Sequence, residues 1–350
     1  MGLLACSLLL QPATAAPALR RGVTAPDRRP DVGYKIGPGP WPVAVTERLV
    51  LKDQRRRRSV EVSVRYPGGK GTRKHPPFPL VVFSPDDKGS RLDVPDLLSH
   101  WASHGYVVVA PLPEDERPRT PHADRVPFDA RQLDRLADVT FVLDSLDQLE
   151  KRMDGFHGRH ATQIARDRIG ISGYAAGALT AQMAIGVKVR VSKPAGEVEL
   201  RSVGDPRIKA AVLLSPQGTV NRMLTRDSWT DLVRPMLVVT GSRDVVAASR
   251  ETPESREEPF TLAKPGQKFL LFIEGATHTS YSLLQDARAD AAAAGPPLPE
   301  GDARLIAGAT AAVTLAFWDG YLQGDERGRD YLASDDITRF SGGKAQLRRR

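Results

Sequence analysis

The chain has almost no cysteine. Cys6 is the only one among its 350 residues, and it lies close to the N-terminus. A chain with a single cysteine cannot close a disulfide within itself. If the N-terminal segment is removed, the mature chain has neither a disulfide nor a thiol nucleophile.

Aromatic residues are also scarce, at 6%, and none is interleaved with the arginine runs at residues 55–58 and 348–350. These runs supply much of the net charge of +8. A nucleic-acid surface of the stacking kind needs aromatic side chains among its basic ones, so we expect no nucleic-acid partner. We expect a solvated hairpin turn at residues 55–58 and a flexible basic tail over residues 336–350. A weak attraction to anionic surfaces is the alternative interpretation.

No hydrophobic run is long enough to span a bilayer, so we expect no integral membrane span. An apolar stretch at residues 3–10 is followed by small residues at 13–16, which is the pattern of a secretory signal peptide. The pattern lacks the usual positive charge at its start. We expect residues 1–16 to be a signal peptide and the protein to be secreted or periplasmic. Residues 3–6 also resemble a lipoprotein box, which leaves a lipid-anchored form open.

The remainder divides into a linker and one domain. Residues 17–42 hold many Pro, Arg and Gly residues without apolar periodicity, which predicts a linker. Residues 43–335 read as a single domain, with 41% hydrophobic residues in the whole chain. We expect a hairpin-like excursion over residues 187–203, where valines alternate with polar residues around Pro194, Ala195 and Gly196.

The apolar pattern predicts an α/β fold. Residues 60–66 alternate apolar and polar side chains, as in an antiparallel edge strand, whereas later strands are continuous apolar runs separated by helices. This favours a mostly parallel central sheet with antiparallel N-terminal strands and helices on both faces. The predicted later strands are residues 80–83, 106–110, 168–172, 210–214, 236–240 and 269–273, and the longest predicted helices are residues 133–149 and 305–321.

A tight turn follows the strand at residues 168–172. Its sequence is Gly173-Tyr174-Ala175-Ala176-Gly177, and a helical stretch comes next. In a nucleophile elbow the pattern Gly-x-Ser-x-Gly makes such a turn, because the glycines permit a close backbone approach that exposes the central side chain. Here both glycines are present, but Ala175 occupies the place of the serine.

Two further residues come at the ends of later strands. Asp244 follows the strand that ends at Thr240, and His278 follows the strand that ends at Ile273. Taken singly, each is more often a turn residue or a surface residue. The order of elbow, Asp and His is, however, that of α/β-hydrolases, which favours a catalytic pair. We expect Asp244 to lie within hydrogen-bond distance of one ring nitrogen of His278, with the other nitrogen facing Ala175.

Several segments together resemble the bacterial "predicted dienelactone hydrolase" group of the α/β-hydrolase superfamily, which is related to platelet-activating-factor acetylhydrolases and polyester hydrolases. The resemblance is carried by residues 79–84, 100–106, 205–210, 214–218 and 240–244. It implies a carboxylic-ester hydrolase without a metal or an organic cofactor. It also implies that Asp244 orients His278, the general base, and that Ala175 stands at the nucleophile position.

The resemblance also points to the oxyanion hole. Relatives have a His-Gly pair where this chain has Pro85-Asp86, followed by Asp87. The N–H groups of Asp87 and Ala176 are the expected donors, but the Asp86 and Asp87 carboxylates would bring negative charge to a place where an oxyanion must form.

Two functions follow from this pattern. The first is an inactive pseudoenzyme whose pocket, bounded by Tyr174, Ala175, Asp87 and His278, binds a small ester or a lipid-like molecule. A methyl group cannot attack a carbonyl, and losing the nucleophile costs about 10⁶-fold in turnover. The second is a carboxylesterase or lipase-like hydrolase that is weakly active by another route, or active in a parent with serine at position 175. The other hydroxyls near the site read as ordinary strand-end or turn residues: Ser84, Ser172, Thr279 and Ser280.

Overall fold

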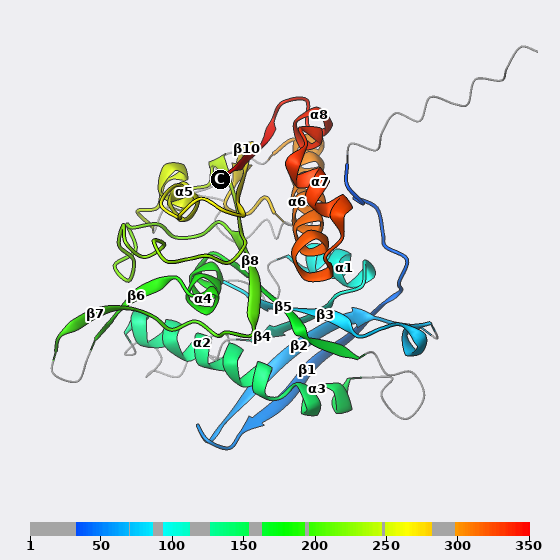
Figure 1. The fold of residues 1–350 in the computed structure, drawn as a ribbon, viewed down its shortest axis with the longest axis vertical. Coiled ribbons are helices and arrows are strands. Elements are labelled where there is room, and N and C mark those ends of the chain that lie inside the picture. The colour runs from blue at the N-terminus through cyan, green and yellow to red at the C-terminus, as the bar shows by residue number, and fades with distance from the viewer. Residues whose placement is uncertain are drawn as a thin grey trace, which may run out of the picture. The chain divides into compact units, whose positions relative to one another are not determined.

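A nine-stranded sheet forms the centre of the computed structural model, which describes residues 33–69, 71–86, 94–112, 127–153, 163–192, 196–246, 249–281 and 298–350 (Figure 1). The predicted signal peptide at residues 1–16 and the first part of the predicted linker lie outside this range. The strand order is β1-β2-β4-β3-β5-β8-β9-β10-β11. The strands are β1 (Val43–Asp53), β2 (Arg58–Pro67), β3 (Phe78–Ser84), β4 (Val107–Pro111), β5 (Ile164–Tyr174), β8 (Ile208–Leu214), β9 (Met236–Arg243), β10 (Lys268–Thr277) and β11 (Ala345–Arg349).

The sheet is mostly parallel, as the sequence predicts. Strands β4, β3, β5, β8, β9 and β10 pair in parallel. The N-terminal strands β1 and β2 are antiparallel, and β2 joins β4 in the antiparallel sense. In a parallel sheet the carboxyl ends of neighbouring strands lie at one edge, so the loops after β5, β8, β9 and β10 meet there.

Helices cover both faces of the sheet, which explains why the parallel strands are apolar on both sides. Alternate residues of β3 enter two separate cores: Leu80 and Val82 pack into one, Val81 and Phe83 into the other. The first core includes residues of α2 (Phe128–Asp144), α3 (Leu146–Arg152), α4 (Ala176–Ile185) and α5 (Pro253–Thr261). The second includes residues of α1 (Pro95–Ser103), α6 (Glu300–Trp318), α7 (Glu326–Ala333) and α8 (Asp336–Phe340).

Helix α6 is the longest helix of the described part, and it is largely apolar. With the π-helical turn after it, at Asp319–Gln323, it is long and apolar enough to cross a membrane by length and composition alone. Its most apolar stretch is 72% buried inside the protein, however. Trp101 of α1 donates its indole N–H to Thr314 Oγ1 at 3.0 Å, which joins α1 to α6. The burial is that of a core helix packed between the sheet and its neighbours.

The prediction of a flexible tail over residues 336–350 is wrong. This segment forms α8 and then β11, which pairs with β10 in the antiparallel sense and completes the sheet. Ala345 and Leu347 are buried while the residues between and after them are exposed. Arginines surround these two apolar residues in the sequence, which makes the alternation difficult to recognise. Arg348 forms an ion pair with Glu257 at 2.9 Å. The domain therefore extends to the end of the chain.

The last part of the predicted linker is also packed. Tyr34 donates a hydrogen bond of 2.8 Å to the buried carboxylate of Asp319, and the backbone N–H of Trp41 bonds Ser103 O at 3.0 Å. The arginine run at residues 55–58 does form the β1–β2 turn, but it is not wholly solvated. Both Arg56 and Arg58 form ion pairs with Asp138 of α2.

The hairpin predicted over residues 187–203 is confirmed. Strands β6 (Lys188–Ser192) and β7 (Val198–Ser202) pair in the antiparallel sense as a separate two-stranded sheet. Val189 of β6 is buried, whereas most residues of β7 are exposed.

The docking of the C-terminal strand is testable with two substitutions on opposite faces of β11. Leu347→Ala removes a buried side chain and is expected to lower the free energy of unfolding by about 2 to 3 kcal/mol. Gln346→Ala on the exposed face is the matched control and should change it by less than about 0.5 kcal/mol. Urea unfolding followed by circular dichroism measures both. Equal, negligible effects would show that the strand is not docked.

Candidate functional site

The turn between β5 and α4 holds a strained alanine. Ala175 has φ 48° and ψ −117°, a conformation that costs a residue with a Cβ about 1 to 3 kcal/mol. The flanking glycines are required by space: a Cβ on Gly173 would lie 2.0 Å from Gly177 O, and one on Gly177 would lie 1.9 Å from Ser84 O. The turn thus has the sharp strand-to-helix geometry that the sequence predicts, with a methyl group at its tip.

Asp244 and His278 lie side by side at the carboxyl ends of β9 and β10. The Nδ1 atom of His278 is 3.0 Å from Asp244 Oδ1, which confirms the predicted hydrogen bond. Within the described part of the chain Nε2 has no hydrogen-bond partner, and His278 lines the same pocket as Ala175. Tyr174, next to the tip of the turn, donates its hydroxyl to His278 O at 2.6 Å and fixes the histidine loop.

The carboxylate of Asp244 is completely buried and surrounded by donors. Its Oδ1 atom accepts from Ser215 Oγ at 2.8 Å and lies 3.0 Å from Arg256 Nε. Thr240 Oγ1 and the Tyr281 hydroxyl donate to Oδ2 at 2.9 and 3.0 Å. Burial alone would raise the pKa of Asp244, but the charge of Arg256 and the hydrogen bonds from His278 and Ser215 lower it to about 2.

Two of these partners, Ser215 and Arg256, are residues that the sequence analysis missed. Ser215 directly follows β8, with φ 51°, and its Oγ also lies 2.8 Å from His278 Nδ1. Its place could have been predicted from the sequence, because a serine that directly follows a strand lies at the same sheet edge as Asp244. Arg256 is 2% exposed on α5, and its guanidinium also donates to Ser215 O and Pro216 O. Nothing local marks it as buried.

The hydroxyls considered from sequence are not arranged as nucleophiles. Ser172 is buried on β5 and its Oγ has no hydrogen-bond partner within the described residues. Ser280 Oγ pairs with Thr277, close to Thr279. Neither Ser84 nor these residues line the pocket. Ser249 does line it, but its Oγ accepts from the backbone N–H of Glu251 at 3.0 Å.

One of the two expected oxyanion-hole donors already has a partner within the protein. The N–H of Ala176, at the start of α4, donates to Asp86 Oδ1 at 3.0 Å. A carboxylate at a helix N-terminus is favoured both by the free N–H groups and by the helix dipole. The Ala176 N–H, one of the two expected donors, is therefore capped by the Asp86 carboxylate, whose negative charge the sequence placed near this site. The second expected donor, Asp87, lies outside the described residues.

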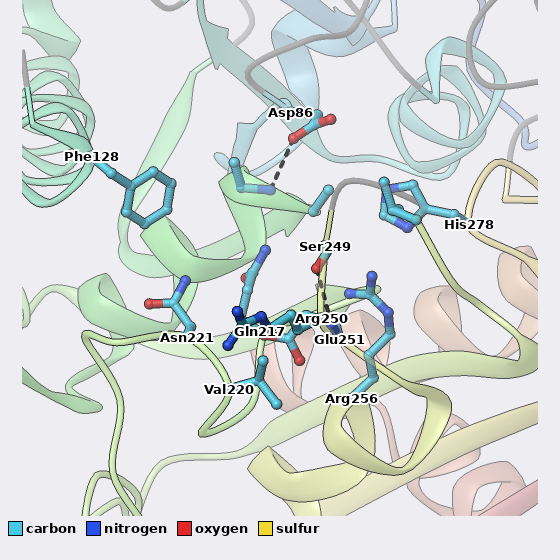
Figure 2. A pocket seen from close by; sticks show the side chains of 13 residues that line it. Asp86, Phe128, Gln217, Val220, Asn221, Ser249, Arg250, Glu251, Arg256 and His278 are labelled. Atoms are coloured by element: carbon cyan, nitrogen blue, oxygen red, sulfur yellow. Dashed lines mark hydrogen bonds between the residues drawn. The ribbon is translucent and has the colours of Figure 1, made fainter. Parts of the chain in front are cut away.

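The pocket in front of the turn has a volume of about 430 Å³ (Figure 2). Figure 2 shows Phe128 and His278 on opposite sides of it, with Asp86 between them at the top of the view. Charged, amide and apolar side chains mix along its wall, so it can hold a small molecule with both polar and apolar parts. The remaining lining residues are Ala175, Ala176, Gln217, Val220, Asn221, Val246, Ser249, Arg250, Glu251 and Arg256. Among the described residues, no three His, Cys, Asp or Glu side chains cluster as metal ligands.

Comparison with known proteins gives no family for this chain. No model of a known protein family matches it, and a search of curated proteins finds no significant match. The α/β class and the mostly parallel sheet are established by the structure itself.

The ion pair between Arg256 and Asp244 predicts a large effect on stability. Arg256→Met keeps most of the side-chain volume but leaves the buried carboxylate without its counter-charge, which should cost about 3 to 5 kcal/mol of unfolding free energy. Arg250→Met is the matched control, because Arg250 is exposed at the pocket and should change stability by less than about 0.5 kcal/mol. Chemical denaturation at pH 7 measures the unfolding free energy of the native chain, of Arg256→Met and of Arg250→Met. A loss below about 1 kcal/mol for Arg256→Met would mean that the pair contributes little.

The lowered pKa of Asp244 predicts a pH-dependent contribution to stability. Because the pKa is about 2 in the folded protein and 3.8 without the fold, the contribution is present above pH 4. It is lost as the pH falls from about 4 to 2, and it amounts to about 2 kcal/mol. The native chain should lose this amount over that range, while Asp244→Asn should not, so the difference in unfolding free energy between them narrows. A constant difference from pH 5 to pH 2 would contradict the assignment.

Proposed function

We propose that this protein is a non-catalytic binding protein built on an α/β-hydrolase site, and that its pocket binds a small ester or a lipid-like molecule. Three features support the hydrolase origin of the site: the strained turn after β5, the order of turn, Asp244 and His278 along the chain, and their meeting at one edge of the sheet. Their joint occurrence is much more specific than any one of them.

The absence of a nucleophile supports the non-catalytic part of the proposal. Ala175 presents a methyl group where the elbow of a serine hydrolase presents its hydroxyl. Ser215 Oγ is within 2.8 Å of His278, but on the Nδ1 side, where it is fully buried and donates to Asp244. A substrate in the pocket would meet the Nε2 side of the ring, where the described residues place no hydroxyl within hydrogen-bond distance.

The observation that carries the proposal is the hydrogen bond from Ala176 N to Asp86 Oδ1. Ester hydrolysis needs this N–H to stabilise the negative oxygen of the tetrahedral intermediate. The bound carboxylate engages this donor, so the intermediate loses its hydrogen bond. It also places a negative charge next to the negative oxygen, so both effects raise the free energy of the intermediate. The missing nucleophile and the occupied Ala176 donor are separate obstacles, and each alone would slow the reaction by orders of magnitude.

The remaining groups favour binding. His278 Nε2 offers a polar contact in the pocket, and Gln217 and Asn221 add amide groups. Phe128, Val220 and Val246 provide an apolar part of the wall. A neutral ester has hydrogen-bond acceptors for the amide groups and apolar chains for this part of the wall, and it brings no second negative charge near Asp86.

A second candidate function is a serine carboxylesterase inactivated only by the change at position 175. One observation favours it: the backbone at Ala175 keeps the strained elbow conformation, and the Asp244–His278 pair is complete. If this second hypothesis is correct, Ala175→Ser alone would be sufficient for full activity. The two candidates therefore differ in the effect that they assign to Asp86.

Hydrolysis of p-nitrophenyl butyrate by designed variants separates the two candidates. We expect no turnover by the native chain above that of His278→Ala, and a low, His278-dependent rate for Ala175→Ser. Adding Asp86→Gly to Ala175→Ser frees the Ala176 N–H and should raise the rate by about 10²- to 10³-fold. Adding Asp86→Asn removes the charge but keeps an acceptor, so its effect measures the charge alone.

Controls make each outcome decisive. Asp227→Asn, an exposed carboxylate outside the pocket, is the matched control and should leave the rate of Ala175→Ser unchanged. If Ala175→Ser is already as fast as the variant with Asp86→Gly, the second candidate is correct. If Ala175→Ser, with or without Asp86→Gly, is no faster than the double variant Ala175→Ser with His278→Ala, the Asp244–His278 pair does not have a catalytic arrangement. Turnover by the native chain that His278→Ala abolishes would refute the non-catalytic proposal.

A further inference from the structure

A second cavity lies on the opposite face of the sheet from α2 and α4. Its volume is about 550 Å³, and no described residue lines both this cavity and the pocket in front of Ala175. Helices α1 and α6, which Figure 1 shows next to each other, supply much of its wall. Leu97, Ala307, Gly308, Ala311 and Phe340 make that wall predominantly apolar. A concave, mostly apolar cavity with a few polar groups is the usual form of a small-molecule site.

Most polar side chains in the wall already have partners. Ser99 accepts from Arg65, Ser103 bonds His100 O and Gly39 N, Tyr281 donates to Asp244, and Arg304 pairs with Glu300. These groups need nothing from a ligand. The remaining polar side chains of the described wall are Asp96 and His100.

Asp96 and His100 each have a buried atom without a partner. Asp96 Oδ2 and His100 Nε2 are almost fully covered in the ligand-free protein and make no hydrogen bond within the described part of the chain. They stand four residues apart on α1, a spacing that places side chains next to each other on one helix face. Buried polar atoms are nearly always hydrogen-bonded, because an unsatisfied one loses its water without compensation. Two such atoms, on side chains one helical turn apart in the wall of one cavity, therefore point to a missing partner.

The chemistry of the two atoms limits what that partner is. Burial, together with the neighbouring His104, lowers the pKa of His100 to about 4, so its ring is neutral at pH 7 and Nε2 can carry a proton to donate. Asp96 Oδ2 can only accept when the carboxylate is ionised. One hydroxyl group meets both needs, since it donates to a carboxylate and accepts from an imidazole N–H.

We propose that this cavity binds an apolar molecule that carries one hydroxyl group, which donates to Asp96 Oδ2 and accepts from His100 Nε2. A carboxylate ligand would be repelled by Asp96. An ammonium ligand would share the cavity with the Arg304 guanidinium and would bury a further charge. A neutral alcohol avoids both costs, and its apolar body fits the wall formed by α6 and Phe340. This site is independent of the function proposed for the pocket at Ala175.

Four compounds with the same apolar body test the proposal by calorimetric titration of the full chain. They are 2-phenylethanol, ethylbenzene, 2-phenylethylamine and phenylacetate. We expect the alcohol to bind at least about tenfold more tightly than the amine or the acid. The ratio of alcohol affinity to ethylbenzene affinity should fall at least about tenfold in His100→Leu, because that variant removes the hydrogen-bond partner and keeps an apolar wall.

The controls distinguish a binding role from a structural one. His75→Leu changes a histidine outside the cavity and should leave the affinity ratio unchanged. Asp96→Leu, which removes the acceptor and keeps an apolar wall, replaces His100→Leu if that variant does not fold. His100→Leu without ligand should also have a higher melting temperature than the native chain, because it removes an unsatisfied buried atom. No saturable binding of the alcohol, a preference for the amine or the acid, or an unchanged ratio in both variants would overturn the proposal.

Discussion

The ionised carboxylate of Asp244, completely buried at the carboxyl edge of the sheet, is the constraint on which the candidate site depends. An isolated charge in the interior would cost far more free energy than a protein of this size has to spare, so it must be paired and hydrogen-bonded. Its partners come from four parts of the chain: the ends of β8, β9 and β10, and helix α5. Because these contacts converge on one group, the position of the His278 ring follows from the need to satisfy Asp244.

A second carboxylate acts on the other side of the site. Asp86 accepts a hydrogen bond from the N-terminus of α4, which in the proposed hydrolase-derived site is the point where an intermediate would place its negative oxygen. Two like charges about 4 Å apart repel by several kcal/mol in the effective dielectric of a protein surface. The site is therefore stable in the state that it has, with the Ala176 N–H satisfied internally, and it resists the charge that ester hydrolysis would create.

The sequence predicts the features that depend on local pattern. Continuous apolar runs predict the parallel strands, the two glycines around Ala175 predict the sharp turn, and Asp244 and His278 were found because each follows a strand end. The features that depend on tertiary packing were not predictable in the same way. Arg256 is buried only because α5 packs against the end of β9, and no periodicity in the helix marks it.

Two further features of the structure depend on packing in the same way. The negative charge of Asp86 near the site was expected, but its bond to Ala176 depends on the path of the backbone after β3. The C-terminal segment was expected to be flexible because arginines dominate its composition. Its two inward positions, Ala345 and Leu347, form a strand only because β10 offers an unpaired edge.

The strained backbone of Ala175 must be interpreted with this packing in mind. An alanine gains no chemistry from a φ of 48°, yet the conformation persists because the surrounding contacts impose it: Gly177 lies against the Ser84 backbone, and Ala175 N bonds Leu214 O at 3.1 Å. The elbow geometry is thus a property of how β5, α4 and β3 pack, and it would be kept whether or not the residue at its tip reacts. The strain at Ala175 is therefore consistent with a hydrolase-derived elbow, but it does not show whether the site reacts. The occupant of the Ala176 N–H is the better guide to what the site does now, because that hydrogen bond can be made either by the protein or by a reacting oxygen, but not by both.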